Sequence, residues 1–388
     1  MCNTKLGLFC AEHEDYIELL SAEPYYIKIK EDGPYIIFSY DQLRSDFNNP
    51  IVQEARGIIF RKGSWENPVC WAFNKFGNYG EGWVKDIDWD TAFVSEKVDG
   101  SLMKVWWDGA WNISTNGTID AFKAEIDAFK TEIDDCRMPN FGEYFVEALH
   151  KYFTSCASFF SVLDSDRTYM FELVGPYNRA VIPYEEPALY FLGARNKYTG
   201  EEFNCSPLVA GALDMGRFKL PKQYPLTSVN DCVKLAETFS WDQEGFVACD
   251  AQFNRVKIKS PAYVMAHFAR NNNVINRKHL INVILTNEVE EFLCYAADYK
   301  EELEKVQNLM KAFCEVGDEI AKSCQRLYDI PKKTYAAWVQ TLPKIYQDLA
   351  FRNYNNVMST EDYTAGWNEN KWNQYLESFE ELIKNYIG

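Results

Sequence analysis

The chain has 388 residues and a formal net charge of −17, with 47% apolar and 25% charged residues. Its length and apolar content suit a large globular protein of two domains, and no apolar run approaches the length of a membrane span. Eleven cysteines occur without a CxxC pair, and only four histidines are present. This composition argues against a disulfide-stapled secreted protein and a histidine-rich zinc site, and it indicates reduced thiols.

The first two-thirds of the chain is predicted to be rich in strands. Alternating apolar residues at 25–30 and 35–40 flank an Asp-Gly dipeptide, which is typical of hairpins, and a second such dipeptide follows at 108–109. Further strands are expected at residues 57–61, 92–96, 102–107, 111–115, 168–174, 188–194, 245–249 and 256–258.

Helical periodicity is predicted at 12–22 and 140–153, and again at 120–133, where the heptad DAFKAEI is followed by DAFKTEI. Two heptads are too few for a coiled coil, so the repeat favours a surface helix packed on the sheet over a partner-binding helix. Residues 200–226 contain three prolines and are expected to be irregular. After Pro261 the apolar spacing becomes helical to the end of the chain.

Residues 97–101 read Lys-Val-Asp-Gly-Ser and lie between two expected strands. KxDG is the pattern in which a lysine amine attacks the α-phosphate of a nucleotide and holds it as a phosphoramide. A lysine must be neutral to attack, so its pKa must be depressed or a base must lie near it. The glycine permits a tight turn close to the ligand. The alternative is a solvated hairpin turn.

Further segments accompany Lys97 in a defined order. They read FSY at 38–40, EARGIIF at 54–60, FNKFGN at 73–78, FELVGPYNRAVIPY at 171–184, EGFVA at 244–248 and VKIKS at 256–260. Together with Lys97, this combination resembles the nucleotidyltransferase motifs of ATP-dependent ligases and mRNA capping enzymes. It is most similar to RNA ligase family 1, the phage-type tRNA-repair ligases.

The resemblance implies an α+β fold. A nucleotidyltransferase (ligase adenylation) domain of antiparallel sheets with flanking helices is expected at residues 1–261, followed by an all-α C-terminal domain at 262–388. It also implies an ATP-dependent RNA ligase for RNA repair, which forms lysyl-AMP and uses Mg²⁺ or Mn²⁺. The expected partner is RNA with 5′-phosphate and 3′-hydroxyl ends, such as nicked tRNA, in the cytoplasm, or in the host cytoplasm if the source is a virus.

Four residues are expected to be catalytic by motif position. Lys97 is the nucleophile, and Lys257 and Lys259 alternate along a strand, so both point to one face. Two ammonium groups at the α-phosphate would stabilise transition-state charge and depress the pKa of Lys97. The alternative for this lysine pair is a solvated strand face. Glu244 resembles the carboxylate that orients a magnesium ion or its waters.

Other residues are expected to bind the nucleotide. Arg56 and Lys75 are expected to contact the ribose, the phosphates or the departing pyrophosphate, and arginine suits bidentate phosphate contact. Glu172 resembles the carboxylate that binds the AMP ribose. Gly100 lets the backbone approach the ligand.

Adenine requires an apolar slot. Only alternate residues of a strand can face it, so the choice within each adjacent pair stays open. Glu96 is a candidate acceptor for the adenine amine or a chance acid before Lys97, and Tyr40 lines the pocket or belongs to the core. The apolar candidates are Phe191 or Leu192 on one strand and Phe246 or Val247 on another.

Two features depart from expectation for an RNA-binding enzyme. The charge of −17 opposes phosphate binding unless basic residues gather in the cleft or only a short RNA end is gripped. Members of the family that the chain resembles often carry a basic K-G-S-like segment after the lysine motif, whereas the matching residues 114–118, STNGT, contain no lysine. A phosphate contact there would come from backbone N–H groups or hydroxyls, or would be missing.

Two other classes of function remain. A DNA ligase or a capping guanylyltransferase would share the fold, but each usually carries an OB-fold where this chain reads as helical. A non-enzymatic assembly factor would not need an intact set of lysines and acids.

Overall fold

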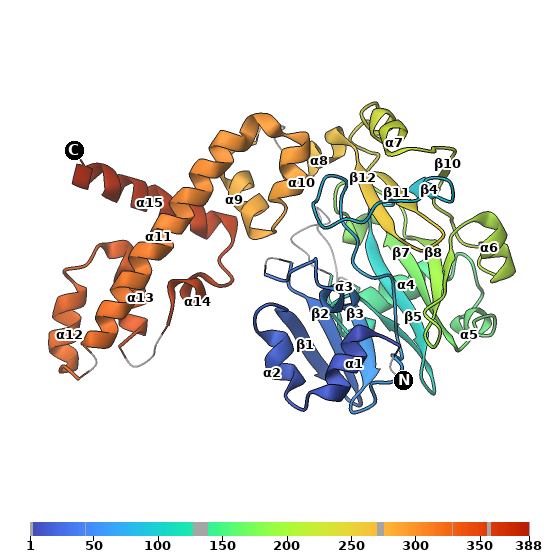
Figure 1. The fold of residues 1–388 in the computed structure, drawn as a ribbon, viewed down its shortest axis with the longest axis horizontal. Helices are drawn as coiled ribbons and strands as arrows, with labels where there is room; N and C mark the ends of the chain where they lie inside the picture. Colours follow the sequence, from blue (N-terminus) through green and yellow to red (C-terminus); the bar gives the residue numbers. More distant parts are fainter. Residues whose placement is uncertain are drawn as a thin grey trace. The chain divides into compact units, whose positions relative to one another are not determined.

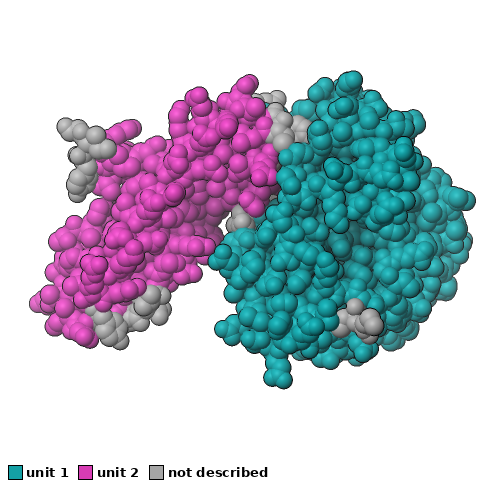
Figure 2. Space-filling view, in the orientation of Figure 1, with its two compact units in different colours: residues 1–267 teal, residues 268–388 magenta. Residues whose placement is uncertain are grey.

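The computed structural model describes residues 3–42, 44–126, 139–269, 275–327, 329–354 and 358–387. The chain forms two compact units, residues 1–267 and residues 268–388 (Figure 2).

The described residues of the first unit form three sheets (Figure 1). Their strand orders are β1-β2-β3, β10-β4-β11-β12 and β6-β5-β7-β8-β9. All strand pairs are antiparallel. The strands are β1 (Ile27–Asp32), β2 (Tyr35–Tyr40), β3 (Arg56–Arg61), β4 (Phe93–Glu96), β5 (Ser101–Trp107), β6 (Trp111–Ser114), β7 (Arg167–Val174), β8 (Ala188–Asn196), β9 (Glu202–Asn204), β10 (Gln223–Tyr224), β11 (Gly245–Cys249) and β12 (Arg255–Lys259).

Short helices flank these sheets. Helix α4 begins with a capping box between Asn140 and Glu143, which satisfies two backbone N–H groups at its first turn. The helices are α1 (Lys5–Glu12), α2 (Tyr16–Ser21), α3 (Pro50–Glu54), α4 (Phe141–Leu149), α5 (Cys156–Phe160), α6 (Pro207–Ala212), α7 (Val229–Ala236) and α8 (Pro261–Ala269).

The five-stranded sheet carries the largest core of the first unit. Phe145 of α4 and Phe159 of α5 contact Phe171 of β7, and all three side chains are fully buried. Burial of each such ring contributes roughly 1.5–3 kcal/mol. This packing fixes the strands β5, β7 and β8, from which several of the predicted site residues project.

The second unit is helical throughout its described residues. Phe313 lies at its centre, with ring-centroid distances of 4.9 Å to Tyr346 and 5.6 Å to Phe379. No helix among the described residues is long and apolar enough to cross a membrane. Its α-helices are α9 (Arg277–Leu285), α10 (Val289–Tyr295), α11 (Lys300–Arg326), α12 (Lys332–Val339), α13 (Lys344–Arg352), α14 (Thr360–Thr364) and α15 (Glu369–Ile387). The predicted α+β class and the helical C-terminal region are confirmed.

Three local predictions were wrong in part. The helix expected at 12–22 is replaced by α1 and α2, which are separate. The stretch 200–226 contains β9, α6 and β10 rather than irregular structure, because Pro207 occupies the first turn of α6, where a missing N–H costs nothing. The first heptad of 120–133 forms only a 3₁₀ turn at Ala121–Lys123.

The 3₁₀ turn ends because its neighbours pair elsewhere. Phe141 N–H donates to the Ala124 carbonyl at 2.9 Å, and Glu125 forms a bridge with Asn140. The backbone groups needed to continue a helix are therefore used by the approach to α4. The rest of the heptad pair, from residue 127, lies outside the described residues.

Candidate active site

Lys97 occupies a fixed position in the backbone, directly after β4. Its N–H donates to the Gly245 carbonyl at 2.8 Å, which continues the pairing of β4 with β11. Its side chain is 22% exposed and lines a pocket of about 290 Å³. The attacking group of the sequence prediction is thus held by a sheet and still open to a ligand.

Glu244 forms the closest ion pair of Lys97. Oε1 of Glu244 lies 2.7 Å from Lys97 Nζ and 3.8 Å from Lys259 Nζ, and the carboxylate is only 3% exposed. Burial raises the pKa of Glu244, while Lys97 and Lys259 oppose this rise. The carboxylate is therefore both a partner for the Lys97 ammonium and a stronger proton acceptor than a solvated glutamate.

Most of the predicted site residues line the same pocket. Five cationic and two acidic side chains face it, so the cavity is basic although the chain carries −17. Clustering of this kind supports the segregated-charge explanation. The predicted residues that line it are the cations Arg56, Lys75, Lys97 and Lys257, the acids Glu96 and Glu172, and Tyr40, Gly100, Leu192 and Val247. The fifth cation, Arg255, was not predicted from the sequence.

The two lysines of β12, Lys257 and Lys259, have different surroundings. Lys257 lines the pocket, and its strand is held there by the segment 77–79, since Lys257 N–H donates to the Gly77 carbonyl at 2.9 Å and Tyr79 N–H donates to the Lys257 carbonyl at 2.7 Å. Lys259 instead contacts Glu244. Lys257 therefore lines the cavity, whereas Lys259 and Glu244 are not among the residues that line it.

The structure separates the members of each adenine-pocket pair. Leu192 and Val247 line the cavity, whereas Phe191 and Phe246 are fully buried in cores on the other faces of their strands. Glu96 lines the cavity too, and its Oε2 accepts from the Lys222 N–H at 3.2 Å. Leu192 of β8 and Val247 of β11, one member of each predicted pair, thus line the same cavity.

Lys75 and Arg56 gather around Tyr40 at one wall of the pocket. Lys75 Nζ lies 4.8 Å from the Tyr40 ring centroid, and Arg56 lies over the Phe76 ring. Burial favours a raised pKa for Tyr40, but the charges of Lys75 and Arg56 outweigh burial and lower it. Tyr40 packs on the core of the first sheet and also lines the pocket, so both alternatives hold.

Glu172 projects from β7 beside Gly100. Desolvation raises the pKa of Glu172 to about 8, the charges of Lys97 and Arg56 oppose the rise, and Glu244 adds to it. A Cβ on Gly100 would lie 2.5 Å from the Leu173 carbonyl oxygen and 2.9 Å from Cγ of Glu172. Only glycine therefore lets the Lys97 loop pass this close to β7.

Asp99 lies inside the KxDG motif, but the sequence analysis assigned it no role. Its Oδ2 accepts from the N–H groups of Val181 and Ile182 at 2.9 and 2.8 Å, and its Oδ1 accepts from the Tyr263 hydroxyl at 2.9 Å. This buried carboxylate ties the Lys97 loop to the segment after β7 and to α8.

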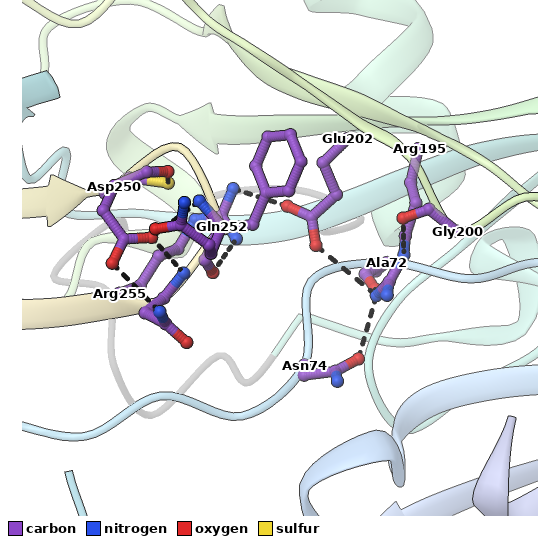
Figure 3. A network of polar contacts seen from close by, with 11 residues as sticks. Ala72, Asn74, Arg195, Gly200, Glu202, Asp250, Gln252 and Arg255 are labelled. Carbon is purple, nitrogen blue, oxygen red and sulfur yellow. Dashed lines mark hydrogen bonds and ion pairs between the residues drawn. The ribbon is translucent and has the colours of Figure 1, made fainter. Parts of the chain in front are cut away.

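A buried ionic network surrounds Arg255, one of the residues that line the pocket (Figure 3). Glu202 bridges two arginines, with Oε2 at 2.6 Å from Arg255 and Oε1 at 3.5 Å from Arg195. Arg195 also donates to the Ala72 carbonyl and to Asn74 Oδ1 at 3.0 and 2.9 Å. The network joins β8, β9 and β12 to the segment that carries Lys75.

The acids of the site suit a divalent cation only in part. Oε2 of Glu244 is buried and has no hydrogen-bond partner among the described residues, as a free oxygen ligand would. No group of three or more acidic, histidine or cysteine side chains is placed to hold a metal in the described part of the chain. A cation here would take few protein ligands and complete its shell with phosphate and water, which is the habit of magnesium.

The first unit combines antiparallel sheets with a pocket whose lysine is paired with a buried carboxylate. Residues 54–263, more than half of the chain, match the family model described as RNA ligase. The chain belongs to this RNA ligase family.

Similar proteins carry related names. A putative bifunctional polynucleotide kinase/RNA ligase of Autographa californica nuclear polyhedrosis virus is 28% identical over 342 residues, which cover 84% of this chain and 46% of that protein. The chain thus spans about half the length of that relative. An RNA ligase of Rhodothermus phage RM378 is 24% identical over 355 residues, 78% of each chain. Among solved structures, an archaeal ATP-dependent RNA ligase has a TM-score of 0.44 and 12% identity, with 80% of each chain covered.

Proposed function

We propose that this chain is an ATP-dependent RNA ligase that joins a 5′-phosphate to a 3′-hydroxyl through a lysyl-AMP intermediate. The single observation that carries the proposal is the Lys97 amine, which opens into a basic pocket while it contacts a buried carboxylate at 2.7 Å. The family match supports the same chemistry.

In the first step, the Lys97 amine attacks the α-phosphorus of ATP. The N–P bond forms as the P–O bond to pyrophosphate breaks, and Glu244 is placed to take the proton that the amine gives up. Lys257 in the cavity would stabilise the charge on the transferring phosphoryl group. Positioning and charge stabilisation supply most of the catalysis in such transfers.

In the next steps, the AMP group moves twice. A 5′-phosphate oxygen of RNA attacks the phosphorus of lysyl-AMP, which breaks the N–P bond and returns the proton to Lys97. An RNA 3′-hydroxyl then attacks the 5′-phosphorus, forms the phosphodiester and releases AMP. Glu172 is suited to accept from a ribose hydroxyl, since it lines the same cavity as Lys97.

ATP fits the residues present, and a divalent cation fits them with few protein ligands. The slot between Leu192 and Val247 offers apolar contact to a base, and Arg56 and Lys75 offer donors to phosphates. Magnesium or manganese, when bound, would neutralise phosphate charge. Glu244, through its unpartnered Oε2, is the residue suited to orient it or its waters.

The RNA substrate is proposed to be a broken strand, such as a nicked tRNA, that has already received a 5′-phosphate. A ligase of this chemistry needs that phosphate as the acceptor of AMP. The viral relative is named as a kinase as well as a ligase, and this chain aligns with about half of it. A polynucleotide 5′-kinase reaction is therefore the class of step that would supply the substrate.

The proposal is tested by incubating the protein with α-labelled ATP and magnesium and then adding 5′-phosphorylated single-stranded RNA. Wild type is expected to become labelled and to form RNA circles. Lys97→Ala is expected to do neither, whereas Lys62→Ala, which removes an exposed lysine paired with Glu31, should behave as wild type. Full labelling of Lys97→Ala would refute the proposal. Sealing of DNA in place of RNA would reassign the substrate.

A further inference from the structure

Lys104 of β5 is a lysine with no exposure to solvent. Its Nζ donates to the Gly57 carbonyl. Among the described residues, no carboxylate lies within ion-pair distance of it. A buried ammonium without a counter-ion is costly, and proteins normally pair such a charge or use it.

The position of Lys104 is directly behind the pocket wall. Gly57 adopts φ +73°, and a Cβ there would lie 2.5 Å from Lys104 Nζ and 2.6 Å from the Asn116 carbonyl oxygen. Gly57 follows Arg56, and both Arg56 and Asn116 line the cavity. Gly57 of β3 therefore lies against both the Lys104 ammonium and the turn at Asn116. Any residue with a Cβ at this position would clash with them.

Two polar atoms of the pocket-lining residues at this point lack hydrogen-bond partners in the described part of the chain. Nη1 of Arg56 and Oδ1 of Asn116 are both buried, and neither has a hydrogen-bond partner among the described residues. Nη1 of Arg56 is a donor whose hydrogen bond a phosphate oxygen would complete, whereas Oδ1 of Asn116 is an acceptor and does not bond to phosphate. Together, Arg56 and Lys104 place positive charge at this part of the wall.

We propose that Lys104 is a positioning residue for phosphate. Its buried charge lies next to the pocket-lining residues Arg56 and Asn116 and favours binding of a phosphate group in the pocket. The turn at 114–118 carries no lysine, and Lys104 is the cross-strand partner of Ser114. This inference deepens the proposed function and rests on it.

The surroundings of Lys104 agree with such a role. Burial lowers the pKa of Lys104 to about 8; Cys70 opposes this and Arg56 adds to it. A phosphate bound at Arg56 would favour the charged form of the lysine. The cross-strand neighbours, Ser114 and Met170, are uncharged.

The test compares Lys104→Gln, which keeps a donor for the Gly57 carbonyl but removes the charge, with Lys104→Met. Lys30→Met is the matched control, because Lys30 is exposed and donates to the same turn at the Gly117 carbonyl, 3.1 Å away. Binding of ATP, pyrophosphate and adenosine is measured on the full chain, with KM and kcat for self-adenylylation and the melting temperature.

Both Lys104 variants are expected to weaken ATP and pyrophosphate binding roughly tenfold, with adenosine binding unchanged and KM affected more than kcat. Lys30→Met should match wild type. If Lys104→Gln binds ATP and pyrophosphate as tightly as wild type, or if adenosine binding is weakened as much as ATP binding, the charge is not the cause and the inference is overturned.

A second arm distinguishes the source of the phosphate. Binding of 5′-phosphorylated RNA is compared with binding of 5′-hydroxyl RNA. If the variants lose affinity only for ATP and pyrophosphate, Lys104 positions the triphosphate. If they lose affinity only for 5′-phosphorylated RNA, Lys104 positions the RNA 5′-phosphate. Unchanged binding of every phosphate ligand refutes the inference, whereas absence of lysyl-AMP in wild type would instead refute the proposed function.

Discussion

Nζ of Lys97 and Oε1 of Glu244 lie 2.7 Å apart, at the junction of β4 and β11. The Glu244 carbonyl also accepts from the Ser260 N–H at 2.7 Å, directly after β12. The nucleophile, its acid and the strand of Lys257 and Lys259 are therefore fixed to one another by backbone pairing. A substitution of the Glu244 side chain is therefore expected to lower the reaction rate more than it lowers the stability of the fold.

Glu244→Gln should slow self-adenylylation by about a hundredfold or more, because glutamine cannot take the proton from Lys97 and loss of a general base typically costs 10²–10⁴-fold. The rate of label incorporation from α-labelled ATP measures this. Glu186→Gln, which breaks the surface pair with Lys151, is the control. A Glu244→Gln protein that labels at the wild-type rate would exclude Glu244 as the proton acceptor.

Lys257→Ala and Lys259→Ala should each slow at least one transfer step by about a hundredfold. Lys257→Ala removes a positive charge that would stabilise the transferring phosphoryl group, and Lys259→Ala removes the positive charge next to Glu244. Melting temperatures should stay close to wild type, because neither lysine contributes to an apolar core. Self-adenylylation and sealing of pre-adenylylated RNA are measured separately to identify the step. Near-normal rates in both assays would remove that lysine from the mechanism.

Glu172 should make stability depend on pH. Its pKa is about 8 in the folded protein and 4.5 ordinarily, so the native state holds a proton that the unfolded state has lost between these values. Stability is therefore expected to fall as pH rises from about 4.5 to about 8. Glu172→Gln stays neutral and should melt progressively higher than wild type across this window. A constant difference from about pH 5 to about pH 9 would contradict the raised pKa.

Glu202→Gln should destabilise the protein by about 3–5 kcal/mol, because it leaves the buried Arg255 without its counter-charge. Chemical denaturation gives the free energy of unfolding. Glu201→Gln, at the exposed neighbouring position, should change it little. A loss below about 1 kcal/mol would show that solvent already compensates Arg255.

Local chemistry explains why much of the first unit could be predicted. The Asp-Gly turns at 32–33 and 108–109 and the alternating strands beside them appear where the sequence indicates them. By contrast, the choice of Leu192 over Phe191 depends on the pairing of β7 with β8, which shifts register between Met170 and Phe171. Period-two alternation alone cannot locate such a shift.

The site could be predicted as a set of residues but not as a set of contacts. Motif order indicated Lys97 and Glu244 but gave no reason to place them in an ion pair. Lys104 was missed because a lysine in an alternating strand is ordinarily solvent-facing, and only the packed structure reveals its burial. Asp99 was in view inside KxDG, but its partners at 181, 182 and 263 are distant in sequence.

The most direct test of the central claim is to locate the nucleotide adduct. The protein is incubated with magnesium and either ATP or GTP, digested, and analysed by mass spectrometry for the mass of a bound nucleotide on each peptide. ATP should leave AMP on Lys97, and the adduct should disappear when pyrophosphate is added, because the first step is reversible. GTP should leave far less, since a slot built for one exocyclic amine rejects a carbonyl there. An adduct on another residue, or none on Lys97, would contradict the account.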